Sequence, residues 1–156
     1  TDAGELSSYL DEHPDLFAEC YIDGREFNLS ILPGGRVLPV CEMCFVDYPA
    51  DKVKIVGYEA KWQEQSFAYQ HTKRSYTFGI DDQGLVEELR RLAKAVYELF
   101  GNSGYARVDV RVDQQKKPFI LEMNSNPCIA ADSGFIAAAS QAGMTYCEVI
   151  EQLLRR

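Results

Sequence analysis

Carboxylate, amide and guanidinium side chains recur at every second position in two neighbouring segments, YARVDVRVD at 105–113 and FILEMNSNP at 119–127. Such groups can bind a divalent cation or neutralise the charge of a phosphate. A short polar turn at 114–117 joins the two segments, so the pattern predicts an antiparallel β-hairpin. The residues with this potential are Arg107, Asp109, Glu122 and Asn124.

The register of this hairpin sets the distance between the two acids. With that turn, Asp109 lies opposite Glu122, and Arg107 lies opposite Asn124. Two carboxylates about 5 Å apart, at an effective dielectric constant near 20, repel each other by about 3 kcal/mol. A shared proton, a nearby arginine or a bound Mg²⁺ ion would offset this repulsion, and carboxylate and amide oxygens are the ligands that Mg²⁺ prefers. The alternative is a solvated polar face, on which Arg107 and Arg111 neutralise the acids.

The opposite face of the hairpin is apolar and needs a covering layer. Alternation assigns this face to Val108, Val110, Leu121 and Met123. Hydrophobic patterns predict further strands at 16–22, 25–32 and 37–44, and helices at 5–13, 85–100, 133–142 and from Thr145 to near Arg156. We therefore expect an α+β fold, a mostly antiparallel sheet with flanking helices on one side.

The segment 47–82 shows no clear periodicity and reads as a long loop rich in lysine, glutamine and aromatic residues. Long loops in compact domains are usually functional or disordered, and we expect this one to close over a ligand.

The five cysteines are scattered along the chain. Cys41 and Cys44 have the spacing of a zinc-ligand pair, but no second pair accompanies them, so a structural strand is the better interpretation. The absence of a disulfide-type pattern favours a reducing cytoplasm.

Composition excludes several classes of protein. The chain has 156 residues, enough for one domain with its own core, and a formal net charge of −8. That charge argues against a nucleic-acid or anionic-membrane surface, and no apolar run is long enough to span a membrane. The chain starts with Thr1 rather than Met, and we expect it to be a piece of a longer protein.

Several motifs in order give the chain a family resemblance. They are Glu19 ahead of GREF (24–27), YEAKW (58–62), GYARVDVRVD (104–113), LEMNSNP (121–127) and DSGF (132–135). Together they resemble the C-terminal part of the ATP-grasp fold, most closely the D-alanine–D-alanine ligase branch of the carboxylate–amine ligases. The resemblance covers nearly the whole chain. It implies that residues 1–156 form a C-terminal lobe, whose N-terminal domain and glycine-rich-loop subdomain lie elsewhere in the parent protein.

The resemblance also implies an ATP site. Glu19 and the backbone after it would meet adenine, Glu26 would hold the ribose hydroxyls, and Lys61 would reach the phosphates. Without the family, Glu26 would be a surface acid and Lys61 a solvated loop lysine. In either case we expect Tyr58 and Trp62 to be packing residues.

For the reaction itself, the resemblance implies a second group of residues. Arg107 would stabilise the negative charge of an acyl-phosphate and a tetrahedral species. Ser133 would contact the substrate carboxylate; without the family it would be a helix cap. The ligands of two Mg²⁺ ions, with Mn²⁺ as the alternative metal, would be Asp109, Glu122 and Asn124.

The implied activity is ATP-dependent joining of a carboxylate to an amine, with small amino acids as substrates and the rest of the parent chain as the partner that completes the site. A homodimer is one option for assembly. Two departures affect the acceptor side: Cys128 replaces the family's glycine, and Asp132 replaces a residue that is often basic or neutral. The alternatives are a ligase for other amino acids or peptides, and a non-catalytic module that senses nucleotide or binds a partner.

Overall fold

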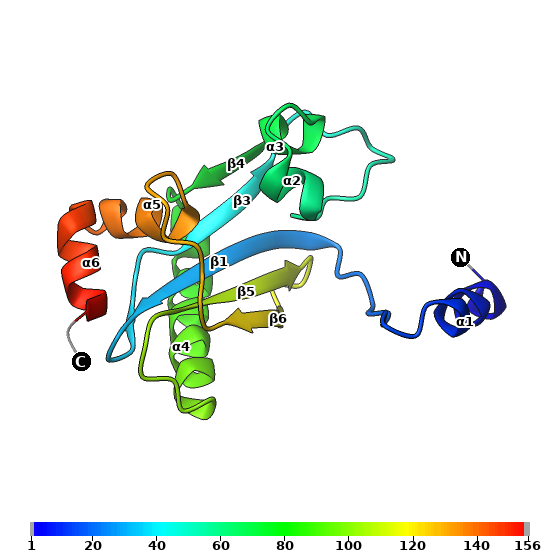
Figure 1. Cartoon of the computed structure of the whole chain (residues 1–156). Coiled ribbons are helices and arrows are strands. Elements are labelled where there is room, and N and C mark those ends of the chain that lie inside the picture. Colours follow the sequence, from blue (N-terminus) through cyan, green and yellow to red (C-terminus); the bar gives the residue numbers. More distant parts are fainter. Residues whose placement is uncertain (1, 155–156) are drawn as a thin grey trace.

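The computed structural model describes residues 2–154, which form one sheet with helices around it (Figure 1). The strand order is β4-β3-β1-β5-β6, and β2 pairs separately with β1. Every pairing is antiparallel, which confirms the predicted α+β class. The strands are β1 (Gly24–Leu32), β2 (Arg36–Val37), β3 (Cys41–Phe45), β4 (Thr72–Ser75), β5 (Ala106–Asp113) and β6 (Pro118–Asn124).

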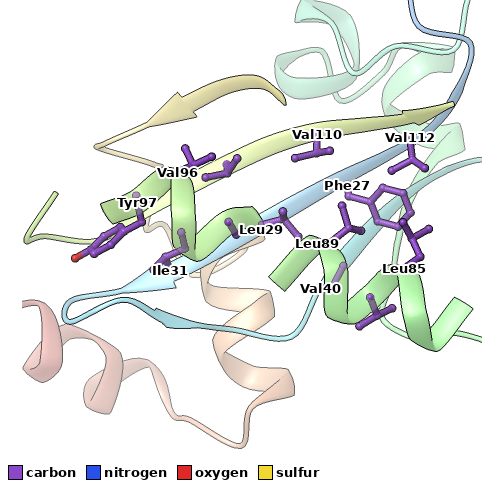
Figure 2. Close-up of a cluster of buried hydrophobic side chains, with 14 residues drawn as sticks. Phe27, Leu29, Ile31, Val40, Leu85, Leu89, Val96, Tyr97, Val110 and Val112 are labelled. Carbon is purple, nitrogen blue, oxygen red and sulfur yellow. The ribbon is translucent and has the colours of Figure 1, made fainter. Parts of the chain in front are cut away.

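Helix α4 (Gln83–Leu99) covers one face of this sheet, close to the predicted range. Its apolar residues, Leu89 among them, pack against alternate residues of β1 and β5, such as Phe27 and Val110 (Figure 2). Burying a side chain of this size contributes about 1.5–3 kcal/mol, so this layer is the main core of the lobe. The other helices are α1 (Ala3–Glu12), α2 (Tyr58–Trp62), α3 (Phe67–His71), α5 (Gly134–Gln141), α6 (Tyr146–Leu154) and the short 3₁₀ turn η1 (Ile80–Asp82).

A second apolar cluster places α5 and α6 at one end of the opposite face. Leu32 of β1 and the buried Leu38 contact Phe135 of α5 and Val149 of α6 in this cluster. In Figure 1 the chain from β6 to α5 crosses in front of the sheet, and α4 lies behind it. The expectation of helices on one side is therefore wrong, because Leu32 lies on the face opposite to the α4 layer and needs its own cover.

The predicted strand at 16–22 is also wrong. Residues 13–23 contain no strand or helix, and most of them are exposed. No strand within residues 2–154 lies alongside this segment to complete a hydrogen-bond ladder, and an alternating sequence alone does not supply one. The predicted strand at 37–44 is divided into β2 and β3, with Pro39 between them; proline has no N–H to offer a ladder.

The segment 47–82 is more ordered than a loop. It contains α2, α3, η1 and the edge strand β4, which pairs with β3. Helices of five residues are shorter than the window in which a hydrophobic period can be recognised, which explains the missing signal. Tyr48 packs against Phe67 with ring centroids 5.4 Å apart and so ties α3 to the chain after β3.

Helix α6 begins with the expected capping chemistry. Thr145 and Glu148 form the predicted capping box: the Thr145 N–H donates to Glu148 Oε2 at 2.7 Å, and the Glu148 N–H donates to Thr145 Oγ1 at 3.3 Å. Helix α6 is described to Leu154, and its expected end near Arg156 lies outside the described residues. None of the helices in residues 2–154 has the length and apolar character needed to cross a membrane.

Candidate active site

The polar residues of three strands form rows on the sheet face opposite α4. Asp109 pairs with Glu122 and Arg107 with Asn124, the two pairs expected from the sequence, although beside the turn Val112 rather than Asp113 lies opposite Pro118. The β1–β5 register extends both rows and adds a third. The rows are Ser30–Arg107–Asn124, Asn28–Asp109–Glu122 and Glu26–Arg111.

A β-bulge changes the register beyond Asp109. Val110 pairs with Ile120 instead of Leu121, so Leu121 is the extra residue. Its predicted place on the core face is wrong: its side chain is 41% exposed and borders the same cavity as Glu122. The bulge adds an apolar side chain to an otherwise charged site.

Arg107 neutralises Asp109 directly. Its Nε and Nη2 donate to Asp109 Oδ1 and Oδ2 at 2.6 and 2.7 Å, and Asn28 Nδ2 donates to Oδ1 at 3.0 Å. Burial disfavours the charge of Arg107, but the hydrogen bonds and charge of Asp109 outweigh it and raise the pKa of the guanidinium. The charge of Arg107 thus offsets the repulsion expected between the two acids, so the fold does not need a bound metal ion to do this.

Two of the three acids on this face, Asp109 and Glu26, are buried, whereas Glu122 is exposed. Asp109 is 4% exposed and Glu26 is 5% exposed, which excludes the surface-acid interpretation of Glu26. Glu26 Oε2 accepts a hydrogen bond from Arg111 Nη1 at 2.9 Å and one from the Val56 N–H at 3.3 Å. Burial raises the pKa of the Glu26 carboxyl, and the charge of Arg111 opposes that rise.

A cavity of about 300 Å³ gathers most of the predicted site residues. It is lined by Phe17, Glu19, Glu26, Val56, Lys61, Asp109, Leu121 and Glu122. A larger cavity of about 460 Å³ lies near the β5–β6 turn and includes Arg25, Lys54 and Lys116, but none of the predicted residues. The smaller cavity is the candidate site, because its lining comes from segments far apart in the sequence whose side chains suit one ligand.

Three predicted residues lie outside that lining: Arg107, which binds the lining residue Asp109, and also Asn124 and Ser133. Asn124 shares the row of Arg107, and its Oδ1 accepts a hydrogen bond from the Asn126 N–H at 2.9 Å. Ser133 caps α5, accepting a hydrogen bond from the Ile136 N–H at 3.4 Å, so the cap interpretation is confirmed. Its predicted substrate contact stays a prediction.

Tyr58 and Trp62 do not pack, contrary to expectation. Their side chains are 71% and 64% exposed on α2, the short helix that also carries Lys61. A helix of five residues has too few contacts to bury two large rings, so the sequence overestimated their burial.

The cysteines form no metal centre. Cys41 is buried and Cys44 is three residues further along the same strand, so their side chains point to opposite faces of the sheet. No group of three or more His, Cys, Asp or Glu residues within 2–154 is arranged to hold a metal ion. A site at Asp109 and Glu122 therefore has two acids and needs further oxygen ligands.

Sequence reasoning missed three residues that shape the cavity or its acids, and it considered Arg111 only for the alternative of a solvated polar face. Asn28 could have been found, since it is in phase with Glu26 on its strand, as Arg111 is with Asp109 on β5. Phe17 and Val56 carry no such signal, because they lie in irregular segments that only the fold brings to the cavity.

Comparisons with known proteins agree with this architecture. Residues 5–155 match the family described as "D-ala D-ala ligase C-terminus", and the chain belongs to this family. It is 32% identical over 148 residues to the D-alanine–D-alanine ligase of Laribacter hongkongensis, a match that covers 92% of this chain and 44% of that protein. It is 34% identical over 140 residues to the D-alanine–D-alanine ligase of a Synechococcus species, covering 90% of this chain and 39% of that protein.

A solved structure shares the fold. The D-alanine–D-alanine ligase from Bacillus anthracis complexed with ATP superposes with a TM-score of 0.71 at 23% identity, over 98% of this chain and 46% of that one. The chain thus spans less than half the length of these relatives.

Proposed function

We propose that this chain is the C-terminal ATP-grasp lobe of an ATP-dependent carboxylate–amine ligase that acts through an acyl-phosphate. One observation carries the proposal. Asp109 and Glu122 lie opposite each other on one sheet face, beside Arg107, and border the same cavity as Glu26 and Lys61. Two opposed acids and a lysine around one cavity, with an arginine bound to one of the acids, suit a nucleotide with its metal ions.

The cavity has parts that suit each end of ATP. Phe17 and Leu121 offer apolar surface beside Glu19, in keeping with an adenine site. Glu26 Oε2 is held by two donors, and no hydrogen bond within residues 2–154 reaches Oε1, which leaves that oxygen for the ribose hydroxyls. Lys61 supplies the positive charge that the phosphates require.

The donor set fits Mg²⁺, with Mn²⁺ as the alternative. Asp109 accepts three hydrogen bonds and a carboxylate has about four lone-pair positions, so one position stays open. Glu122 has no hydrogen bond or ion pair among the described residues. With Asn124 these residues would hold two ions together with phosphate oxygens, the type of site that Mg²⁺ favours. Such ions supply charge neutralisation and orientation to phosphoryl transfer.

Arg107 and the first turn of α5 carry the remaining roles. The guanidinium of Arg107 is fixed by Asp109, so its charge is already in place to stabilise an oxyanion without reorganisation. Ser133 lies at the N-terminus of α5, where backbone N–H groups favour a substrate carboxylate. The reaction needs no side-chain nucleophile.

The rest of the parent protein would complete the site. We infer that a further domain and a glycine-rich-loop subdomain cover the phosphates from the other side, since this chain spans less than half of the length of its relatives. We propose amino acids as substrates and the cytoplasm as the location, and we propose no nucleic-acid or membrane partner.

The second candidate is a ligase for other amino acids or peptides, because two departures from the family pattern lie on the acceptor side. Asp132, which departs from the family pattern, precedes the Ser133 cap, and its carbonyl accepts a hydrogen bond from Arg74 Nη1 at 2.9 Å. Cys128, the other departure, is exposed. Both lie on the chain that leads from β6 to α5, beside the Ser133 cap that would contact the substrate carboxylate.

Phosphate release by the full-length parent, measured with ATP, Mg²⁺ and a panel of amino-acid pairs, tests the function. We expect release with at least one pair and its loss in Arg107→Met. ATP binding without phosphate release for any pair would instead identify a non-catalytic module. Absence of ATP binding would overturn the proposal altogether.

A further inference from the structure

Arg111 is a buried arginine that makes many hydrogen bonds, and the ATP site described above does not explain them. It is 2% exposed, and its guanidinium makes five hydrogen bonds to groups in three segments of the chain. A buried guanidinium costs several kcal/mol unless its donors are satisfied, so each of these bonds matters. The acceptors are the carbonyls of Ile22 (2.6 Å), Gly24 (3.0 Å) and Lys54 (2.7 Å), Glu26 Oε2 (2.9 Å) and the Tyr21 hydroxyl (3.4 Å).

Two of these bonds join β5 to segments with which it has no strand pairing. Ile22 lies near the end of the irregular segment that brings Phe17 and Glu19 to the cavity, and Lys54 is two residues before Val56, which also lines it. The bonds from Arg111 to Ile22 and Lys54 span 89 and 57 residues in the sequence. One side chain thus fixes two walls of the cavity to β5.

Arg111 also fixes the direction of Glu26. Its Nη1 and the Val56 N–H both bind Oε2, so the carboxylate cannot turn without breaking two hydrogen bonds. Since Lys54 is held by the same guanidinium, the Val56 N–H is itself positioned by Arg111. The remaining oxygen, Oε1, is the only part of the carboxylate left to meet a ligand in the cavity.

We propose that Arg111 is a positioning residue for nucleotide recognition, which aims Glu26 at the ribose hydroxyls and assembles the walls of the nucleoside pocket. This inference rests on the proposed ATP-binding function. It assigns ribose selectivity to a residue that touches no nucleotide itself. A purely structural role for Arg111 would affect the affinity for all nucleotides equally.

Calorimetric titration of the full-length parent with Mg²⁺ complexes of ATP and 2′,3′-dideoxy-ATP distinguishes the two roles. Hydrogen bonds to a charged group contribute about 1.5–3 kcal/mol, and 1.4 kcal/mol is tenfold, so the wild-type protein should prefer ATP by roughly 10- to 100-fold. In Arg111→Met the preference should fall below about threefold, because Glu26 is no longer aimed. A preference retained at the wild-type level would overturn the inference.

Arg25→Met is a matched control. Arg25 precedes Glu26 on β1 and also forms a network, to Glu42 and Asp82, but it does not contact Glu26. Its loss should lower stability and leave the ATP preference unchanged. Equal loss of preference in both variants would show a general structural effect and overturn the inference.

Arg111→Lys serves if Arg111→Met does not fold. Lysine keeps the positive charge, but one ammonium cannot reach acceptors in three segments, so the preference should fall at least threefold from the wild-type value; an unchanged preference would contradict the proposal. Failure of the wild-type protein to bind either nucleotide would overturn the proposed function, and with it this inference. If only the inference about Arg111 is wrong, the wild-type protein should bind nucleotide, and both Arg111 variants should keep its preference for ATP over 2′,3′-dideoxy-ATP.

Discussion

Glu122→Gln separates the chemistry of the acid pair from its effect on the fold. The substitution keeps the shape of the side chain and removes one charge from the row that contains Asp109. At about 5 Å the repulsion removed is about 3 kcal/mol at an effective dielectric constant of 20, and about 1 kcal/mol in water. Glu122 is exposed, so the lower figure applies.

The charge of Arg107 further reduces the stability gained by removing this repulsion. Glu122 also attracts Arg107, and this attraction is lost in the variant. The two effects have opposite signs, and we expect the free energy of unfolding to change by less than about 1 kcal/mol, or about 3 °C in Tm for a domain of this size. Thermal unfolding followed by circular dichroism measures this.

Activity should respond very differently. Changes to groups that only orient metal ligands typically cost 10- to 100-fold, so removing the charge of a direct ligand should lower ATP turnover by at least about 100-fold. A higher Mg²⁺ concentration should recover part of the loss. Glu88→Gln on α4, an exposed glutamate outside the site, is the control and should match the wild type. Wild-type turnover in Glu122→Gln at ordinary Mg²⁺ would refute the metal site.

Other changes test separate parts of the molecule. Arg107→Met leaves Asp109 buried without its ion pair and should lower the unfolding free energy by about 3 kcal/mol in denaturant titrations, as well as abolish turnover; a stable variant would mean that the pair contributes little. Ser133→Ala removes the α5 cap and should cost about 1 kcal/mol, and a rise in amino-acid KM beyond this stability effect would support a substrate contact. The pKa of Glu148 is lowered by its hydrogen bonds from Thr145, so its contribution to stability is present above the ordinary glutamate pKa and is lost as pH falls; Glu148→Gln should flatten that part of the pH–stability curve. Amide exchange around Lys61 should slow when ATP and Mg²⁺ are added, whereas equal protection without nucleotide would argue against a closing segment.

The existence of the hairpin was predictable, because two polar–apolar alternating segments flank a short turn. Its register was only partly predictable: a turn at 114–117 places Asp113 opposite Pro118, whereas Val112 takes that place, and the bulge at Leu121 restores the expected pairs Asp109–Glu122 and Arg107–Asn124. The bulge itself was not predictable, since residues 119–121 are all apolar and their sequence does not show where the alternation changes phase. The covering helix α4 was also clear, because seventeen residues give several turns of hydrophobic period.

The rest of the site depends on contacts that are distant in sequence. Arg111 could be placed in phase with Asp109, but its partners Ile22 and Lys54 lie in segments without regular structure. Nothing local to those segments indicates a carbonyl that faces a buried guanidinium. The same holds for Phe17, which reaches the cavity from a segment expected to be a strand.

The arrangement of charges also decides which acid is the better probe of a metal site. Asp109 is bound by Arg107 and Asn28, so its replacement would break an ion pair as well as remove a ligand. Activity lost in Asp109→Asn would therefore have two explanations. Glu122 has no such partner among the described residues, and its carboxylate faces the cavity. A cation bound there would gain most of its attraction from Glu122, because the charge of Asp109 is already offset, and loss of activity without loss of stability at this one position points to the metal.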